Sequence, residues 1–153
     1  MRQPFFVAEL TINHLGMVKI AKMMIDAAQQ AGAHAVKLKL KNVKKYYKKE
    51  KANWRNFDFL EYRKSLELSH DDFVDIAAFC QGKEIPWFCT VHDLESLEFI
   101  RSLNPLFYKV ASMDSSKLDF VDSVLTTCRD DKKKLVISIG GKSDEETKGI
   151  VDK

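Results

Sequence analysis

Two lysines stand inside apolar stretches of this chain, where a charged side chain calls for a specific reason. Lys37 follows Val36 in one stretch, and Lys109 precedes Val110 in another. A lysine that points into a converging site binds phosphate or carboxylate groups. A lysine on a strand face can also reach solvent along its own hydrocarbon stem. Two such lysines on neighbouring units favour a site for an anionic ligand.

Polar residues also follow the apolar stretches, at the points where strands would end. A carboxylate such as Glu9 can act as an acid or a base, orient a substrate, cap the next helix or pair with a lysine. Ser112 and Asp114 follow Lys109 closely and either hold a sugar or phosphate or cap a helix. The complete set of candidates comprises Glu9, Asn13, Lys37, Thr90, Lys109, Ser112, Asp114 and Ser138.

Other possible sites are less well supported. The four histidines show no metal-ligand spacing, so no metal site is assigned from them. Residues 37–55 hold nine lysines or arginines and one glutamate, and the segment 44–59 interleaves lysines with Tyr46, Tyr47, Trp54 and Phe57. Such a pattern is found in nucleic-acid binders. It is more often a solvated loop with its aromatic rings packed down, so nucleic acid is the least favoured partner.

The elements that position these residues repeat in a fixed order. Apolar stretches at 5–10, 35–40, 87–90, 107–111 and 135–139 predict strands, and helical patterns follow each of them. Ser69 with Asp72 and Ser143 with Glu146 have the spacing of helix-capping pairs. Alternating strands and helices predict a parallel sheet with crossover helices.

Two parallel architectures fit this order, an open doubly wound sheet or part of a (β/α)8 barrel. The turn at 11–16 lacks the G-x-G-x-x-G motif of a dinucleotide-binding sheet. Polar residues at the carboxyl ends of several strands favour the barrel, because the functional groups of barrels lie at that face. A closed barrel needs about 250 residues. The 153 residues therefore predict a single domain, 1–153, that is a partial TIM barrel of about five β-α units.

Composition bounds the class of protein. With 45% hydrophobic and 31% charged residues, the chain is globular, and no apolar run approaches the roughly 18 residues of a membrane span. Its three cysteines form no C-x-x-C pair, which favours a reducing, cytoplasmic location over a disulfide framework.

Six segments in the same order resemble the N-acetylneuraminate (sialic acid) synthase family. Residues 8–16, A-E-L-T-I-N-H-L-G, are similar to its A-E-I-G-x-N-H-x-G, and residues 31–37 are similar to its A-G-A-D-A-V-K. The remaining matches are E-L-S at 67–69, C-T-V-H-D-L-E-S at 89–96 for S-T-P-F-D-x-E-S, Y-K-V-A-S at 108–112 for Y-K-I-A-S, and V-I-S-I-G at 136–140 for I-L-S-T-G. The resemblance covers nearly the whole chain.

The resemblance implies a function. The family condenses phosphoenolpyruvate with an N-acylated amino sugar such as N-acetylmannosamine, releases phosphate and uses a divalent metal, Mn²⁺ or Mg²⁺. Glu9 would lie by the sugar aldehyde, Asp114 stands where the family has a glutamate, and Asn13 would contact substrate. The residues implied in holding phosphoenolpyruvate are Lys37, Thr90, Lys109, Ser112 and Ser138.

The chain also departs from the family pattern. Thr11 replaces a glycine, Leu15 an asparagine, and Val91-His92 the usual Pro-Phe. The family's metal-ligand histidines come from later strands and its antifreeze-like domain follows the barrel, and neither is present in these 153 residues. We therefore expect self-association or a second chain that completes the barrel. The alternative is a non-catalytic half-barrel that serves as a binding or assembly module.

Overall fold

The chain folds into a five-stranded parallel sheet with helices between the strands. The computed structural model describes residues 4–47 and 57–152. The strands pair in chain order, β1-β2-β3-β4-β5, and every pairing is parallel. The elements are β1 (Val7–Glu9), α1 (Val18–Gln30), β2 (Ala35–Leu40), α2 (Val43–Tyr46), α4 (Phe59–Ser65), α5 (His70–Gly82), β3 (Trp87–Val91), α6 (Leu94–Ser102), β4 (Phe107–Val110), α7 (Leu118–Asp130), β5 (Lys134–Ile137) and α8 (Asp144–Val151).

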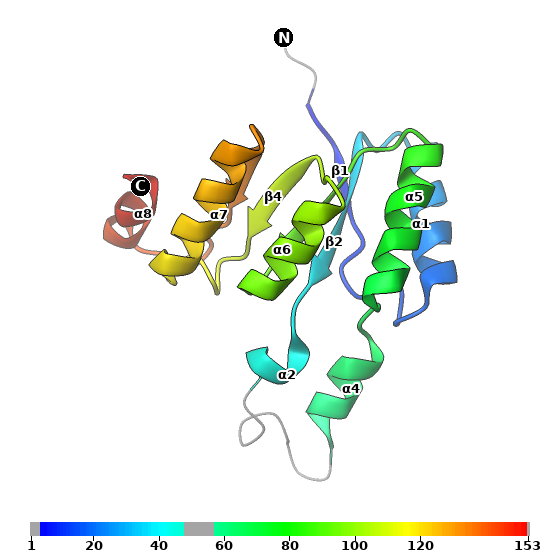
Figure 1. Cartoon of the computed structure of the whole chain (residues 1–153), viewed down its shortest axis with the longest axis horizontal. Helices are drawn as coiled ribbons and strands as arrows, with labels where there is room; N and C mark the ends of the chain where they lie inside the picture. The colour runs from blue at the N-terminus through cyan, green and yellow to red at the C-terminus, as the bar shows by residue number, and fades with distance from the viewer. Residues whose placement is uncertain (1–3, 48–56, 153) are drawn as a thin grey trace.

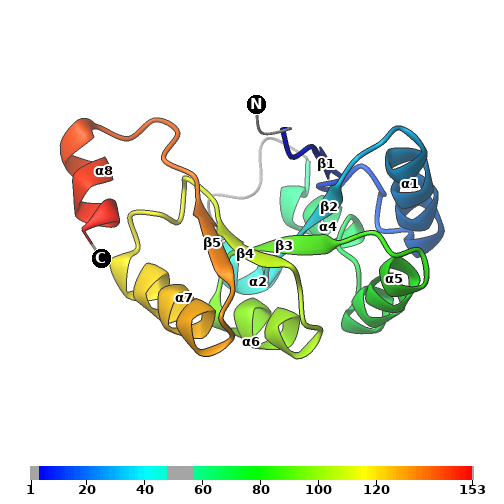
Figure 2. The ribbon, with the colours of Figure 1, turned by 90° about the horizontal axis from the view of Figure 1, so that it is seen from above.

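The predicted partial barrel is confirmed, including all five strands. Helices α1, α5, α6 and α7 form an arc along one side of a curved sheet (Figures 1 and 2). Because successive strand residues point to opposite faces, Val36, Leu38 and Leu40 face these helices and are buried in the main core. The two short helices α2 and α4 lie between β2 and α5, where the sequence pattern indicates no helix.

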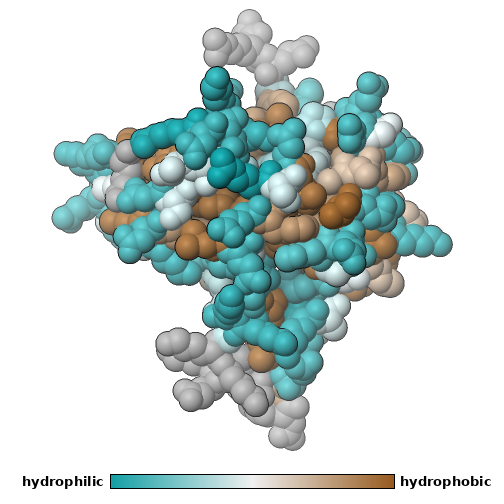
Figure 3. Space-filling view, in the orientation of Figure 1, coloured by the Kyte–Doolittle hydropathy of each residue, from teal (hydrophilic) through white to brown (hydrophobic). Residues whose placement is uncertain are grey.

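The inner face of the sheet carries the other half of each strand. The residues on this face are Val7 and Glu9 of β1, Lys37 and Lys39 of β2, Phe88 and Thr90 of β3, Phe107 and Lys109 of β4, and Val136 of β5. Val7 is 38% exposed and Val136 is 41% exposed, although both are apolar. In Figure 3, hydrophilic residues cover much of the opposite, helical surface, with hydrophobic residues visible between them.

Local signals start the helices where the sequence predicts. Ser69 and Asp72 form a reciprocal capping box at α5, and Ser143 and Glu146 form another at α8. Each pair satisfies two backbone N–H groups that a helix start would otherwise leave without partners. These caps fix the chain direction immediately after the loops that follow β2 and β5.

The turn after β1 has an unusual backbone. Thr11 and Leu15 both have positive φ angles, of 47° and 54°. These are two of the positions at which the chain departs from the resembled pattern, and a left-handed conformation disfavours a β-branched residue such as threonine. Gly16 has a φ of 73°, and a Cβ there would clash with the backbone carbonyl of Ser65. This turn therefore holds the end of β1 against α4.

Candidate functional site

A polar row crosses the inner face at the carboxyl ends of the first four strands. Glu9 is the register partner of Lys37, and Thr90 is the register partner of Lys109. Lys37 is only 4% exposed, forms an ion pair with Glu9 and donates a hydrogen bond of 3.0 Å from Nζ to Thr90 Oγ1. A buried ammonium needs such partners to offset its lost hydration. The structure thus brings four of the predicted site residues together.

Lys109 completes this row without a partner of its own. Its ammonium makes no hydrogen bond or ion pair with any residue that the structure describes. Burial lowers the pKa of Lys109, and the positive charge of Lys37 lowers it further. An incoming anion would offset both effects, because its negative charge would pair with the Lys109 ammonium.

Two serines extend the row toward β5. Ser138 follows β5 and donates its backbone N–H to the carbonyl of Val110, which fixes it beside the end of β4. The Ser112 Cβ and the Ser138 Oγ each lie 3.9 Å from the position that a Cβ of Gly140 would occupy. The two serines therefore flank Gly140, and its missing side chain leaves space between them.

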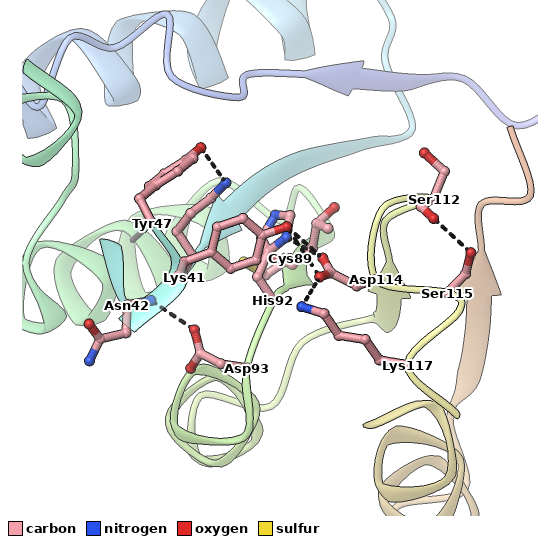
Figure 4. A network of polar contacts seen from close by, with 12 residues as sticks. Lys41, Asn42, Tyr47, Cys89, His92, Asp93, Ser112, Asp114, Ser115 and Lys117 are labelled. Atoms are coloured by element: carbon pink, nitrogen blue, oxygen red, sulfur yellow. Dashed lines mark hydrogen bonds and ion pairs between the residues drawn. The ribbon is translucent and has the colours of Figure 1, made fainter. Parts of the chain in front are cut away.

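Asp114 occupies a separate polar cluster at the same rim. It is completely buried, and its carboxylate accepts hydrogen bonds from Lys117 Nζ at 2.6 Å and from the Tyr46 hydroxyl at 3.1 Å. His92 Nδ1 lies 2.6 Å from the same carboxylate. Figure 4 shows His92, from the end of β3, and Lys117 converging on Asp114. The predicted pair of carboxylates, Glu9 and Asp114, is thus divided between the row and this cluster.

The electrostatics of the cluster favour an ionised aspartate beside a neutral histidine. Burial opposes ionisation of Asp114, but hydrogen bonds from His92 and Lys117 hold its pKa below the usual value. Burial lowers the pKa of His92 and outweighs the opposing effect of Asp114. Burial also raises the pKa of Tyr46, so its hydroxyl stays protonated and donates a hydrogen bond to the Asp114 carboxylate.

The turn after β1 holds the last predicted residue, Asn13. It is exposed, and its backbone N–H donates to the carbonyl of Leu10. The Glu9 carboxylate accepts a hydrogen bond of 3.1 Å from the backbone N–H of Thr11 and remains 44% exposed. Glu9 is therefore accessible from the rim, whereas Asn13 joins neither the row nor the cluster.

Three residues of the cluster were not among the predicted site residues. Tyr46 was assigned to a basic aromatic loop, His92 was noted only as a departure from a pattern, and Lys117 was not considered. One signal was available for His92, since it lies two positions after Thr90 and so continues the same face of the strand. No local signal places Tyr46, because its contact with Asp114 spans 68 positions of sequence.

The described part of the basic aromatic segment is packed onto the protein. Lys41 Nζ lies 4.4 Å from the ring centroid of Tyr46, and Tyr47 packs edge-on against Phe59. Trp54 and the other residues of 48–56 lie outside the described residues. Among residues 4–47 and 57–152, no helix is long and apolar enough to cross a membrane.

The residues that the structure describes do not form a cage for a divalent metal. No group of three or more histidine, cysteine, aspartate or glutamate side chains gathers in the described part of the chain. Glu9 pairs with Lys37, and Asp114 pairs with Lys117. Both carboxylates thus have ammonium partners that would repel a cation.

The fold and the site together define a class of protein, a portion of a (β/α)8 barrel whose inner face carries a row formed by Glu9, Lys37, Thr90 and Lys109. The chain belongs to the NeuB family, whose family model matches residues 24–153. It is 29% identical over 154 residues to N-acetylneuraminate-9-phosphate synthase of Mus musculus and 27% identical over 153 residues to pseudaminic acid synthase of Campylobacter jejuni.

A solved structure supports the fold over almost the whole chain. The N-acetylneuraminic acid (sialic acid) synthetase of Leptospira borgpetersenii superposes with a TM-score of 0.83 at 24% identity, covering 99% of this chain and 50% of that one. The two sequence relatives are each matched over 95% of this chain. This chain nevertheless spans only 42% of the mouse protein and 43% of the Campylobacter protein.

Proposed function

We propose that this chain is the phosphoenolpyruvate-binding portion of a nonulosonic acid synthase. In this proposal, phosphoenolpyruvate condenses with an N-acylated amino sugar of the N-acetylmannosamine type, giving a nonulosonic acid and phosphate. The observation that carries the proposal is the row of Lys37, Thr90 and Lys109, in which the buried Lys37 ammonium is paired and the half-buried Lys109 ammonium has no described partner. Family membership and the names of the relatives support the same chemistry.

The row fits the charges of this substrate. Phosphoenolpyruvate carries a phosphate and a carboxylate, and both are recognised by ammonium groups and hydroxyl donors. Lys109 would meet one anionic group directly, while Lys37 and Thr90 would meet the other. Ser112 and Ser138 would donate hydroxyl hydrogen bonds beside Gly140, where the missing side chain lets a phosphate approach.

The proposed reaction balances without an oxidant or reductant. The enol carbon of phosphoenolpyruvate forms a C–C bond to the sugar aldehyde, whose oxygen becomes an alkoxide. Water adds to C2, and the C–O bond to phosphate then breaks, leaving a keto acid. One proton of the water ends on the new hydroxyl, and the other leaves with the phosphate.

The two carboxylates take different roles in this proposal, Glu9 in proton transfer and Asp114 in orienting the sugar. Glu9 is exposed at the rim and is held by Lys37, so it can accept a proton from the attacking water. Asp114 is ionised and hydrogen-bonded, which suits it to orienting the sugar. Asn13 would contact the sugar from the turn after β1.

The proposal includes a second set of strands over the inner face. Val7 and Val136 are apolar and substantially exposed there, and β1 and β5 present unpaired edges that favour association. A second copy would supply strands alone, whereas another chain would supply the strands together with the metal ligands. Light scattering on the pure chain should therefore give a mass above 17.6 kDa, and a stable monomer would count against association.

The decisive experiment measures phosphate release from phosphoenolpyruvate with N-acetylmannosamine and Mn²⁺, first with the chain alone and then with a carboxyl-terminal half of a relative added. Release that disappears in Lys109→Ala supports the proposal. The control is Lys19→Met, which removes an exposed lysine of α1 with the same change in charge. Absence of both phosphate release and phosphoenolpyruvate binding, with and without the added half, would refute it.

A further inference from the structure

His92 is a buried group that the proposed chemistry does not use. Its side chain is 2% exposed, and its Nε2 atom is buried without a hydrogen-bond partner among the residues that the structure describes. Buried polar atoms are nearly always paired, so an unpaired one calls for a specific explanation.

The hydrogen bonding of the other ring nitrogen fixes what Nε2 can do. Nδ1 lies 2.6 Å from the Asp114 carboxylate, which Lys117 helps to keep ionised. An ionised carboxylate only accepts hydrogen bonds, so Nδ1 carries the proton. In the neutral ring, Nε2 is therefore an acceptor with a free lone pair.

The position of His92 places this acceptor next to the polar row. His92 follows Thr90 by two residues and so continues the inner face of β3, at its carboxyl end. The ammonium groups of Lys39 and Lys41 are close enough to disfavour a positive charge on the ring. The ring of Tyr46 packs edge-on against it, with the ring centroids 5.3 Å apart.

The surroundings restrict what this acceptor can bind. A cation would be repelled by Lys39 and Lys41, and an anion would face a lone pair instead of a donor. A neutral O–H or N–H donor remains. Fully ionised phosphoenolpyruvate has no such donor, whereas an N-acylated amino sugar carries several hydroxyl groups and an amide N–H.

We propose that His92 Nε2 accepts a hydrogen bond from the amino sugar and thereby selects the second substrate of the site. This inference rests on the proposed function. The Tyr46 hydroxyl donates a hydrogen bond to Asp114, and a neutral sugar hydroxyl could donate the same bond. Tyr46 belongs to α2, a single turn of four residues, and in this proposal it exchanges its place on Asp114 for a sugar hydroxyl.

Two measurements on the 153-residue chain test this inference. The first is calorimetric binding of N-acetylmannosamine to the wild type, to His92→Phe and to the control Tyr46→Phe. His92→Phe keeps a ring of similar size but removes the acceptor, so we expect sugar affinity to fall roughly five- to tenfold while affinity for phosphoenolpyruvate is unchanged. Tyr46→Phe removes a competing donor from the same cluster and should not weaken sugar binding.

The second measurement is made on the wild type and does not depend on how a variant folds. The ¹⁵N resonance of His92 Nε2 should shift when N-acetylmannosamine is added and stay in place when inorganic phosphate is added. Equal sugar affinities of wild type and His92→Phe, an Nε2 resonance unmoved by the sugar, or no sugar binding at all would each overturn the inference. Failure of phosphoenolpyruvate to bind would refute the proposed function alone, because a sugar-dependent shift of Nε2 would still support the role of His92.

Discussion

The Lys109 ammonium should lower the stability of the fold and strengthen the binding of phosphoenolpyruvate. The variant Lys109→Met tests both effects. Its ammonium is half-buried and has no described partner, while Lys37 Nζ lies 3.0 Å from Thr90, the register partner of Lys109. Burial and the positive charge of Lys37 both disfavour the Lys109 ammonium, and the Glu9 carboxylate offsets only part of this. A shift of one pKa unit corresponds to about 1.4 kcal/mol, so the net cost of this charge is on the order of 1 kcal/mol. Methionine has a similar length and no charge, so the variant should be more stable by about this amount.

Binding should change in the other direction. A hydrogen bond to a charged group contributes about 2 kcal/mol, so the variant should bind phosphoenolpyruvate roughly thirtyfold more weakly. Urea unfolding measures the first effect, as a rise of about 0.5 M in the midpoint, and calorimetry measures the second. The exposed Lys19→Met variant, with the same change in net charge, should move neither. A Lys109→Met protein that is less stable and binds as tightly as the wild type would refute the electrostatic reasoning.

Three further outcomes follow from the described contacts. Gly16→Ala places a Cβ against the carbonyl of Ser65 at a positive φ and should lower the free energy of unfolding by about 3 kcal/mol, as measured in urea. Thr11→Gly removes a β-branched residue from a φ of 47°, so the free energy of unfolding should rise by about 1 kcal/mol and the urea midpoint should rise with it. Because the folded-state pKa of His92 is lowered, the unfolded chain binds its proton first, so stability should fall between pH 7 and pH 5. His92→Phe should flatten that slope, and an unchanged slope would show that other groups cause it.

Much of the fold could be predicted because its signals are local. Alternation of Lys37 and Lys39 with apolar neighbours gives the inner and outer faces of β2, and the spacing of Ser69 and Asp72 gives the start of α5. The four-residue helix α2 escaped prediction because one turn is too short for a hydrophobic period to be seen.

The candidate site also has a part that the sequence pattern predicts and a part that it does not. Lys37, Thr90 and Lys109 were predicted to converge because parallel strands end at one rim. The hydrogen bond between Lys37 and Thr90 and the register of Thr90 with Lys109 agree with this. The cluster around Asp114 could not be predicted from local pattern. It depends on the path of the chain after β2, which brings Tyr46 to a residue 68 positions later. No periodicity within a strand or helix encodes such a contact.

The chain order of the sheet also bears on how the protein folds. Each strand pairs with the strand that was synthesised just before it. Every new strand can therefore add to the exposed edge of the strands already formed. The steps are unequal in length: Cys89 of β3 pairs with Tyr108, 19 positions later, whereas Val36 of β2 pairs with Trp87, 51 positions later. Closing the longer loop costs about 1 kcal/mol more in chain entropy. The joining of β2 to β3 is therefore the expected bottleneck in folding, and the excursion that delays it is the one that brings Tyr46 to His92.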